Sequence, residues 1–102
     1  MITVKIGEEE RAVSEVTAQW VNDQLHRRRA DGVAVCVRVV LKTDSLNMVL
    51  ATPECQGMGG GGRAPNEKER QLLELWEHRG LNDRAFSSGN VIAFLNQLQR
   101  AL

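Results

Sequence analysis

Apolar and polar residues alternate at the start of the chain. Ile2, Val4 and Ile6 alternate with Thr3 and Lys5, a spacing that predicts a strand with one buried face. Gly7 then ends this strand. The polar residues 8–10 predict a turn that leads into a short second strand at 11–13, which we prefer to the alternative of the first turn of a long helix.

Residues 33–42 form the strongest strand pattern of the chain. Val37, Val39 and Leu41 belong to a continuously apolar face, whereas Arg38 and Lys42 lie on a mixed face that we expect to be partly wet. Residues 46–51 alternate in the same way after a short polar turn at 43–45. Two such runs joined by a turn predict an antiparallel hairpin.

Three segments have helical spacing instead. The first covers 15–29, with Ser14 as its expected N-cap and a basic C-terminal end. The second covers 67–79, where Asn66 and Glu69 have the spacing of a capping box and Gly80 follows the last turn. The third covers 91–101, with Asn90 as its expected N-cap.

The resulting order, β-(β)-α-β-β-α-α, lacks regular βαβ alternation. It therefore predicts an α+β fold in which a small, mainly antiparallel sheet packs its helices on one face. The chain has 102 residues, so we expect a single domain over residues 1–102. The tryptophans at 20 and 76 lie on helical apolar stripes, and we expect both to pack in the core.

Charge gives no general pull toward polyanions, because thirteen basic residues balance thirteen acidic ones. The local run of arginines at 27–29 is interpreted as a solvated helix end, and nucleic-acid binding through it is kept only as a weaker alternative. The apolar runs are too short to cross a bilayer, and the first residues lack a signal-peptide layout. These features predict a cytoplasmic protein without a membrane partner.

The chain contains two cysteines, which is too few for a disulfide scaffold. Cys36 lies in an apolar strand pattern and is expected to be a buried free thiol. Cys55 precedes a predicted helix and is a weak candidate for a catalytic thiol. His26 and His78 do not combine with the cysteines at metal-ligand spacing, so no metal site and no cofactor are expected.

The most unusual segment is the glycine-rich loop predicted between the hairpin and the second helix. It matches G-x-G-x-x-G literally, but its flanks lack the features of a dinucleotide fingerprint or a phosphate loop. Backbone N–H groups, a guanidinium and a helix start could still hold an anion or another ligand. The candidate ligand-binding residues are Gly59, Gly60, Gly61, Gly62, Arg63 and Asn66.

No catalytic set stands out, whereas a long loop and open sheet edges provide contact surface. We therefore expect a non-catalytic protein-interaction or adaptor domain, which binds an unidentified protein partner or a second copy of itself. If the chain pairs with itself, an isologous dimer through a strand edge or the last helix is expected. The alternative is ligand or anion binding, or thiol-dependent activity, at the glycine-rich loop.

Overall fold

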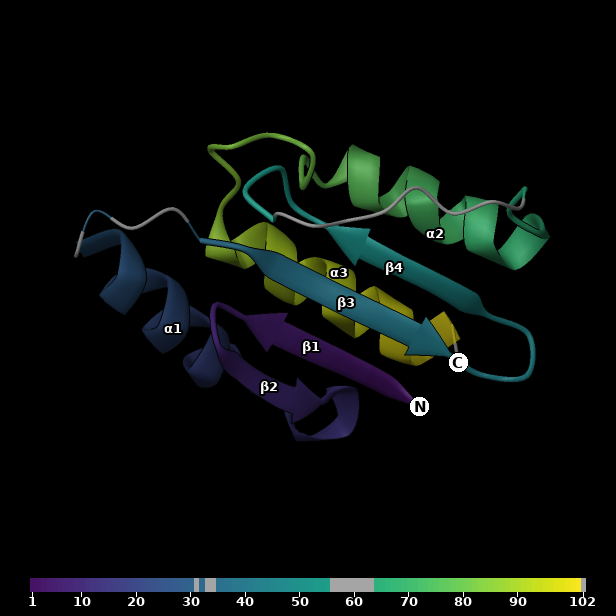
Figure 1. Cartoon of the computed structure of the whole chain (residues 1–102), viewed down its shortest axis with the longest axis horizontal. Coiled ribbons are helices and arrows are strands. Elements are labelled where there is room, and N and C mark those ends of the chain that lie inside the picture. The colour runs from purple at the N-terminus through teal and green to yellow at the C-terminus, as the bar shows by residue number, and fades with distance from the viewer. Residues whose placement is uncertain (31, 33–34, 56–63, 102) are drawn as a thin grey trace.

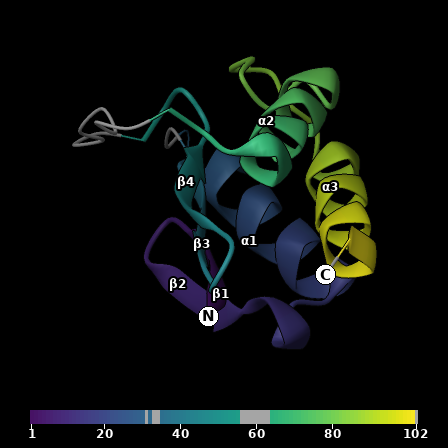
Figure 2. The ribbon, with the colours of Figure 1, turned by 90° about the vertical axis from the view of Figure 1, so that its right-hand side faces the viewer.

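The computed structural model describes residues 1–30, 32, 35–55 and 64–101. In this part of the chain, four strands form one antiparallel sheet and three helices pack against it (Figure 1). Figure 2 shows the sheet edge-on, with the helices on one side of it. The expected α+β fold and the expected order of elements are thereby confirmed. The strands are β1 (Ile2–Ile6), β2 (Glu9–Ala12), β3 (Val37–Lys42) and β4 (Asn47–Ala51), and the helices are α1 (Ala18–Ala30), α2 (Glu67–His78) and α3 (Ser88–Ala101).

The sheet has the order β2-β1-β3-β4, so β1 and β3 lie inside it and β2 and β4 form its edges. Val39 of β3 lies opposite Val4 of β1 on one side and opposite Leu50 of β4 on the other. Because side chains alternate between the faces of a strand, this register places all three on the helix-facing side. The predicted faces of residues 33–42 are confirmed for the described strand, where Val37, Val39 and Leu41 are fully buried.

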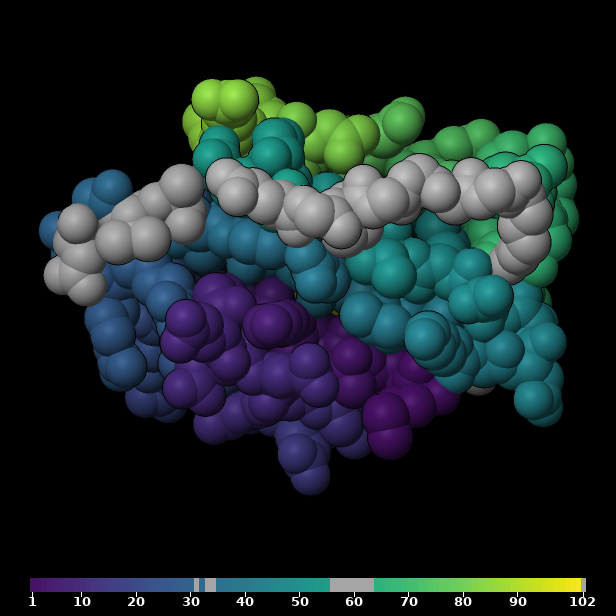
Figure 3. All heavy atoms as spheres, in the orientation of Figure 1, coloured from purple at the N-terminus to yellow at the C-terminus, as the bar shows by residue number. Residues whose placement is uncertain are grey.

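The helices cover that face and close the core. Helix α1 packs against β1 and α3, while α2 packs against β4 and α3. Trp76 of α2 meets Phe94 of α3 edge-on, with ring centroids 5.1 Å apart. Trp20 and Trp76 are both buried, as expected from their helical stripes. Among the described residues, no helix lies over the opposite face of the sheet, which is the side toward the viewer in Figure 3.

Two helix starts differ from the prediction. Ser14 lies in a short 3-10 turn, η1 (Val13–Glu15), and α1 begins only at Ala18. Its first turn is capped by Thr17, whose Oγ1 accepts a hydrogen bond from the N–H of Trp20 at 3.1 Å. Helix α3 begins at Ser88 rather than after Asn90, because the hydroxyl of Ser87 accepts from the N–H of Asn90 at 3.2 Å.

The strand limits also shift. Strand β2 begins at Glu9, because Gly7 has a positive φ of 62° and forms a tight turn with Glu8. Strand β3 begins at Val37, where its pairing with β1 ends at Ile6. The predicted residues 33 and 34 lie outside the described part of the chain. Gly80 has a φ of 70° just beyond α2, which confirms it as the residue that follows the helix.

Candidate functional site

The sequence-predicted ligand site falls mostly outside the described part of the chain. Gly59, Gly60, Gly61, Gly62 and Arg63 all belong to residues 56–63, which the structure does not describe. The remaining candidate, Asn66, is described and lies at the start of α2.

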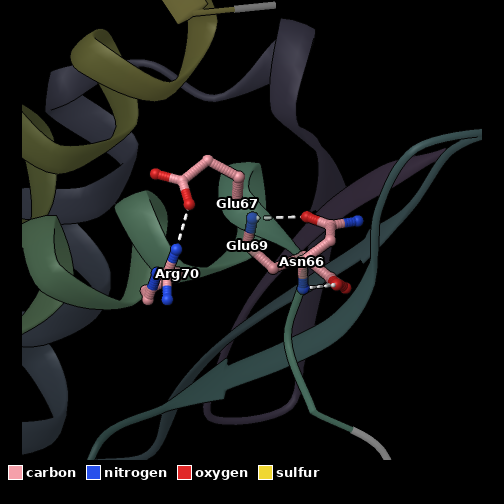
Figure 4. Close-up of polar contacts among 4 residues, drawn as sticks. All are labelled: Asn66, Glu67, Glu69 and Arg70. Atoms are coloured by element: carbon pink, nitrogen blue, oxygen red, sulfur yellow. Dashed lines mark hydrogen bonds and ion pairs between the residues drawn. The ribbon is translucent and has the colours of Figure 1, made fainter.

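Asn66 forms the predicted capping box with Glu69 (Figure 4). Its Oδ1 accepts a hydrogen bond from the Glu69 N–H at 2.9 Å, and its own N–H donates to Glu69 Oε1 at 3.0 Å. Its Nδ2 donates to the carbonyl of Ser45 at 2.8 Å. Oδ1 thus caps the first turn of α2, and Nδ2 fastens the start of α2 to the β3–β4 turn.

Glu69 extends this attachment to the edge of the sheet. Its side chain is 1% exposed, and Oε2 accepts a hydrogen bond from the N–H of Asn47 on β4 at 2.9 Å. A carboxylate in the first turn of a helix interacts favourably with the positive end of the helix dipole.

The structure corrects the prediction for the cysteines. Cys36 and Cys55 form a disulfide, with their Cα atoms 4.6 Å apart, so neither is a free thiol. Cys36 immediately precedes β3 and Cys55 follows β4, and the antiparallel pairing of these strands brings the two ends together. In the disulfide, Cys55 cannot act as a nucleophile, because nucleophilic attack requires a thiolate.

Thr52 anchors the chain between β4 and the disulfide. It is 2% exposed, its N–H donates to the carbonyl of Val37 at 3.0 Å, and its Oγ1 accepts from the N–H of Val37 at 3.0 Å. The N–H of Cys55 then donates to the carbonyl of Thr52 at 3.1 Å, which closes a turn. This turn, residues 52–55, has a fixed position at the end of β4.

The two edges of the sheet differ in chemistry. Strand β2 carries Glu9, Glu10 and Arg11, which are exposed and make unwanted strand pairing unfavourable. Strand β4 has the sequence Asn-Met-Val-Leu-Ala, without charge or proline. Val49 is 39% exposed, which only Met1 exceeds among the large apolar residues that the structure describes. Within the described residues, the β4 edge therefore lacks the charged side chains that protect β2.

The hydrogen-bond pattern shows which backbone groups face this edge. The N–H of Thr43 donates to the carbonyl of Leu46 at 2.9 Å, and the N–H of Thr52 donates to the carbonyl of Val37 at 3.0 Å. Both are therefore hydrogen-bonded residue pairs of the β3–β4 ladder, and such pairs form alternating rows with pairs that are not hydrogen-bonded. Since these rows alternate, Val49 and Ala51 direct their N–H and C=O groups away from β3. Within the described residues, no protein group bonds to them on that side.

A groove of about 310 Å³ lies between this edge and α2. Val49 and Ala51 line it from the strand, while Leu73 and Trp76 form an apolar wall from the helix. Glu77 is on its exposed rim. Pro53 and Cys55 of the 52–55 turn also line it. We call this site the β4–α2 groove. Sequence analysis anticipated open edges in general, but the pairing order was needed to identify this one.

A larger hollow of about 610 Å³ lies between α1 and the start of α3. Asp23, His26 and Ser88 all line it, which are residue types that can form a nucleophilic relay. No hydrogen bond links these three side chains among the described residues. A relay needs its nucleophile and base within hydrogen-bond reach, so this hollow gives weaker support for a function than the groove.

Two of the three arginines at the end of α1 make contacts within the protein. Arg29 donates through Nη2 to the carbonyl of Phe86 at 2.5 Å, and its guanidinium lies 4.9 Å from the centre of the Phe86 ring. The guanidinium of Arg28 lies beside Gly7. These contacts join α1 to the segment before α3 and to the β1–β2 turn.

Searches with protein-family models, against curated proteins and against solved structures find no match to this chain. None of the described helices has the length and apolar character needed to cross a membrane. In the same part of the chain, His, Cys, Asp and Glu side chains do not gather in groups that could hold a metal ion.

Proposed function

We propose that this protein is a small, non-catalytic protein-interaction domain that binds a short extended segment of a partner protein in the β4–α2 groove. The observation that carries the proposal is the combination in this groove of an unprotected strand edge with an apolar helix wall. Strand addition of this kind takes affinity from backbone hydrogen bonds and specificity from pockets for alternate side chains.

The groove offers both parts of such recognition. Val49 and Ala51 present backbone donors and acceptors to an added strand. Every second side chain of that strand would point toward Leu73 and Trp76 of α2. The exposed carboxylate of Glu77 on the rim favours a segment that carries a Lys or Arg beside its aliphatic residues.

Glu69 favours a short segment over a second copy of the whole sheet edge. Antiparallel pairing of two β4 strands about Val49 would place Ala51 of one copy opposite Asn47 of the other. The N–H of Asn47 is already bonded to Glu69, so the Ala51 carbonyl would find no donor there. The open length is therefore limited to the end of β4 near Thr52.

A peptide selection tests the proposal. Random peptides displayed on phage are selected against the purified protein, and the best peptide is titrated into isotope-labelled protein. We expect amide chemical-shift changes at Val49, Ala51, Leu73 and Trp76, and selected sequences with alternating aliphatic residues and a basic residue. Shift changes confined to the uncovered sheet face or to the 610 Å³ hollow would contradict the proposal.

Two substitutions at one position sharpen the test. Val49→Pro removes the N–H that an added strand needs but no bond to β3, because this N–H faces the free edge. Val49→Thr keeps the N–H and the β-branched shape and is the matched control. We expect the peptide to bind the Thr variant and not the Pro variant, while both keep the native amide spectrum. Equal binding by the two would argue against strand addition.

The dimer expected from the sequence remains the alternative, through a strand edge or through α3. Sedimentation velocity across a wide concentration range distinguishes it from a monomer that takes up a peptide. A dimer that the selected peptide dissociates would show that the groove holds a second copy.

A cytoplasmic location is also part of the proposal. Disulfides persist mainly in oxidising compartments, so in the cytoplasm the Cys36–Cys55 bond would open and close. Rapid alkylation of thiols in intact cells, followed by mass spectrometry of fractionated material, tests both the location and the state of the bond.

A further inference from the structure

One wall of the β4–α2 groove is covalently tied to the centre of the sheet. Cys55 lines the groove and is bonded to Cys36, which immediately precedes the inner strand β3. Pro53 lies in the same 52–55 turn and also lines the groove. Any change in the disulfide therefore acts directly on a surface that the peptide would contact.

The remaining attachments of this turn show how far such a change would extend. Thr52 is held by two hydrogen bonds to the backbone of Val37, one through its N–H and one through its Oγ1, and neither involves sulfur. Beyond Thr52, the contacts that the structure shows are the turn bond of the Cys55 N–H, the disulfide itself, contacts of Cys55 Sγ with the Val37 carbonyl at 3.5 Å and Thr52 Oγ1 at 3.8 Å, and an ion pair of Glu54 with Arg84 at 3.4 Å. The sulfur contacts are long, and the ion pair has a strongly exposed arginine, so each holds the turn far less firmly than a covalent bond. Reduction would loosen Pro53 to Cys55 and leave β4 in place.

We propose that the Cys36–Cys55 disulfide is a reversible redox latch that keeps the β4–α2 groove in its binding shape. This inference rests on the proposed function, because it describes the regulation of the same groove. Both cysteines are half-buried, which leaves the bond within reach of a reducing thiol. A surface that is already ordered loses less conformational entropy on binding, so the oxidised form binds more tightly.

The reaction is thiol–disulfide exchange with a dithiol reductant. The reductant's thiolate attacks one sulfur of the Cys36–Cys55 bond, which breaks, and its electron pair leaves on the other cysteine as a thiolate. The second thiolate of the reductant then attacks the mixed disulfide and releases the first cysteine. The two cysteines gain two electrons and two protons, and the dithiol becomes a disulfide.

The experiment uses the peptide selected on the oxidised protein. Its affinity is measured by fluorescence anisotropy for the oxidised protein, for the protein reduced with dithiothreitol, and after reoxidation with glutathione disulfide. We expect binding to weaken about tenfold on reduction, by loss of preorganisation, and to recover on reoxidation. A Cys36→Ala/Cys55→Ala variant should bind like the reduced protein and ignore dithiothreitol.

The amide spectrum of the reduced protein provides a second readout. Changes should be concentrated at 52–55 and at the groove residues of α2, while β1 and α3 keep their native shifts. Collapse of the whole spectrum would overturn a local latch. The latch would not be reversible if the Cys36–Cys55 bond stayed closed in every buffer whose ratio of reduced to oxidised glutathione matches that of the cytosol.

The two proposals fail in different ways. Equal peptide affinity in both redox states, with shifts still in the groove, overturns the latch and leaves the interaction function standing. Peptide shifts outside the groove in both states overturn the proposed function and the latch together. Tighter binding by the reduced form reverses the proposed direction and overturns the latch as stated.

Discussion

The side-chain carboxylate of Glu69 on α2 accepts a hydrogen bond from the backbone N–H of Asn47 on β4, at 2.9 Å. Its other oxygen accepts from the N–H of Asn66. One buried side chain therefore provides the acceptor for a backbone N–H on the edge strand and for another at the start of the helix. This arrangement fixes the start of β4 to the start of α2. It also limits how much of the β4 edge remains open.

Glu69→Ala should lower the free energy of unfolding by about 2–4 kcal/mol, since two N–H groups lose a charged acceptor. Glu69→Gln should cost less than Glu69→Ala, because the glutamine amide oxygen still replaces one of the two carboxylate acceptors, whereas alanine replaces neither. Urea denaturation measures both values. Glu74→Gln on the exposed side of α2 is the control, with an expected change within about 0.5 kcal/mol. A Glu69→Ala variant as stable as this control would show that the contact contributes nothing.

Gly7→Ala should cost slightly more than Gly80→Ala, because both glycines have positive φ but at Gly7 the flexible end of the Arg28 side chain must also move aside. Gly80 has open space where a side chain would be, so its replacement should cost about 1–2 kcal/mol from backbone conformation alone. At Gly7 an added Cβ would overlap the guanidinium of Arg28. A double-mutant cycle with Arg28→Ala, followed by thermal unfolding, isolates that overlap.

In the Arg28→Ala background, Gly7→Ala should therefore cost no more than Gly80→Ala does in the parent protein. If the full penalty of Gly7→Ala persisted without the arginine, the explanation from Arg28 would be wrong.

Thr17→Ala should destabilise the protein by about 1 kcal/mol, because it removes the side-chain acceptor for the Trp20 N–H. Ser14→Ala is the matched comparison, as Ser14 is exposed in η1 and its hydroxyl caps no helix. We expect little change there, measured by the urea midpoint. The opposite ranking would mean that α1 begins in solution where the sequence pattern predicted.

Loss of the disulfide should lower the free energy of unfolding by about 3 kcal/mol, the chain-entropy value for a loop of this size. Cys36 and Cys55 are 19 residues apart in sequence. Urea denaturation with and without dithiothreitol measures the difference, and the Cys36→Ala/Cys55→Ala variant should show no dependence on the reductant. Detection of two free thiols in the native protein by thiol titration under non-reducing conditions would contradict the pairing.

Local patterns predicted the secondary structure well where a residue's role depends on its neighbours in sequence. The alternation around Val39 identified a strand and its buried face, and the Asn66–Glu69 spacing identified a helix cap. Helix starts were less accurate, because Ser14, Thr17 and Ser87 are all suitable caps. The chosen cap depends on where packing of the helix against the sheet begins.

The candidate site could be predicted only in part. That open edges exist follows from a small antiparallel sheet, but nothing local distinguishes the edge at β4 from a central strand. The groove also needs Leu73 and Trp76 of α2, which lie more than twenty residues beyond Val49 and reach it only through the path of the chain. The disulfide escaped prediction for the same reason, because the strand pairing determines the separation of Cys36 and Cys55.

The sequence by itself determined the class of fold, the order of elements, the buried faces of the strands and the cap of α2. These depend on periodicity and on side chains a few residues apart, which physical rules connect directly to backbone shape. Tertiary structure decided the strand order, the cysteine pairing and the bond from Glu69 to Asn47. Each of these joins residues distant in the chain, and their proximity arises only when the sheet and helices pack around one core.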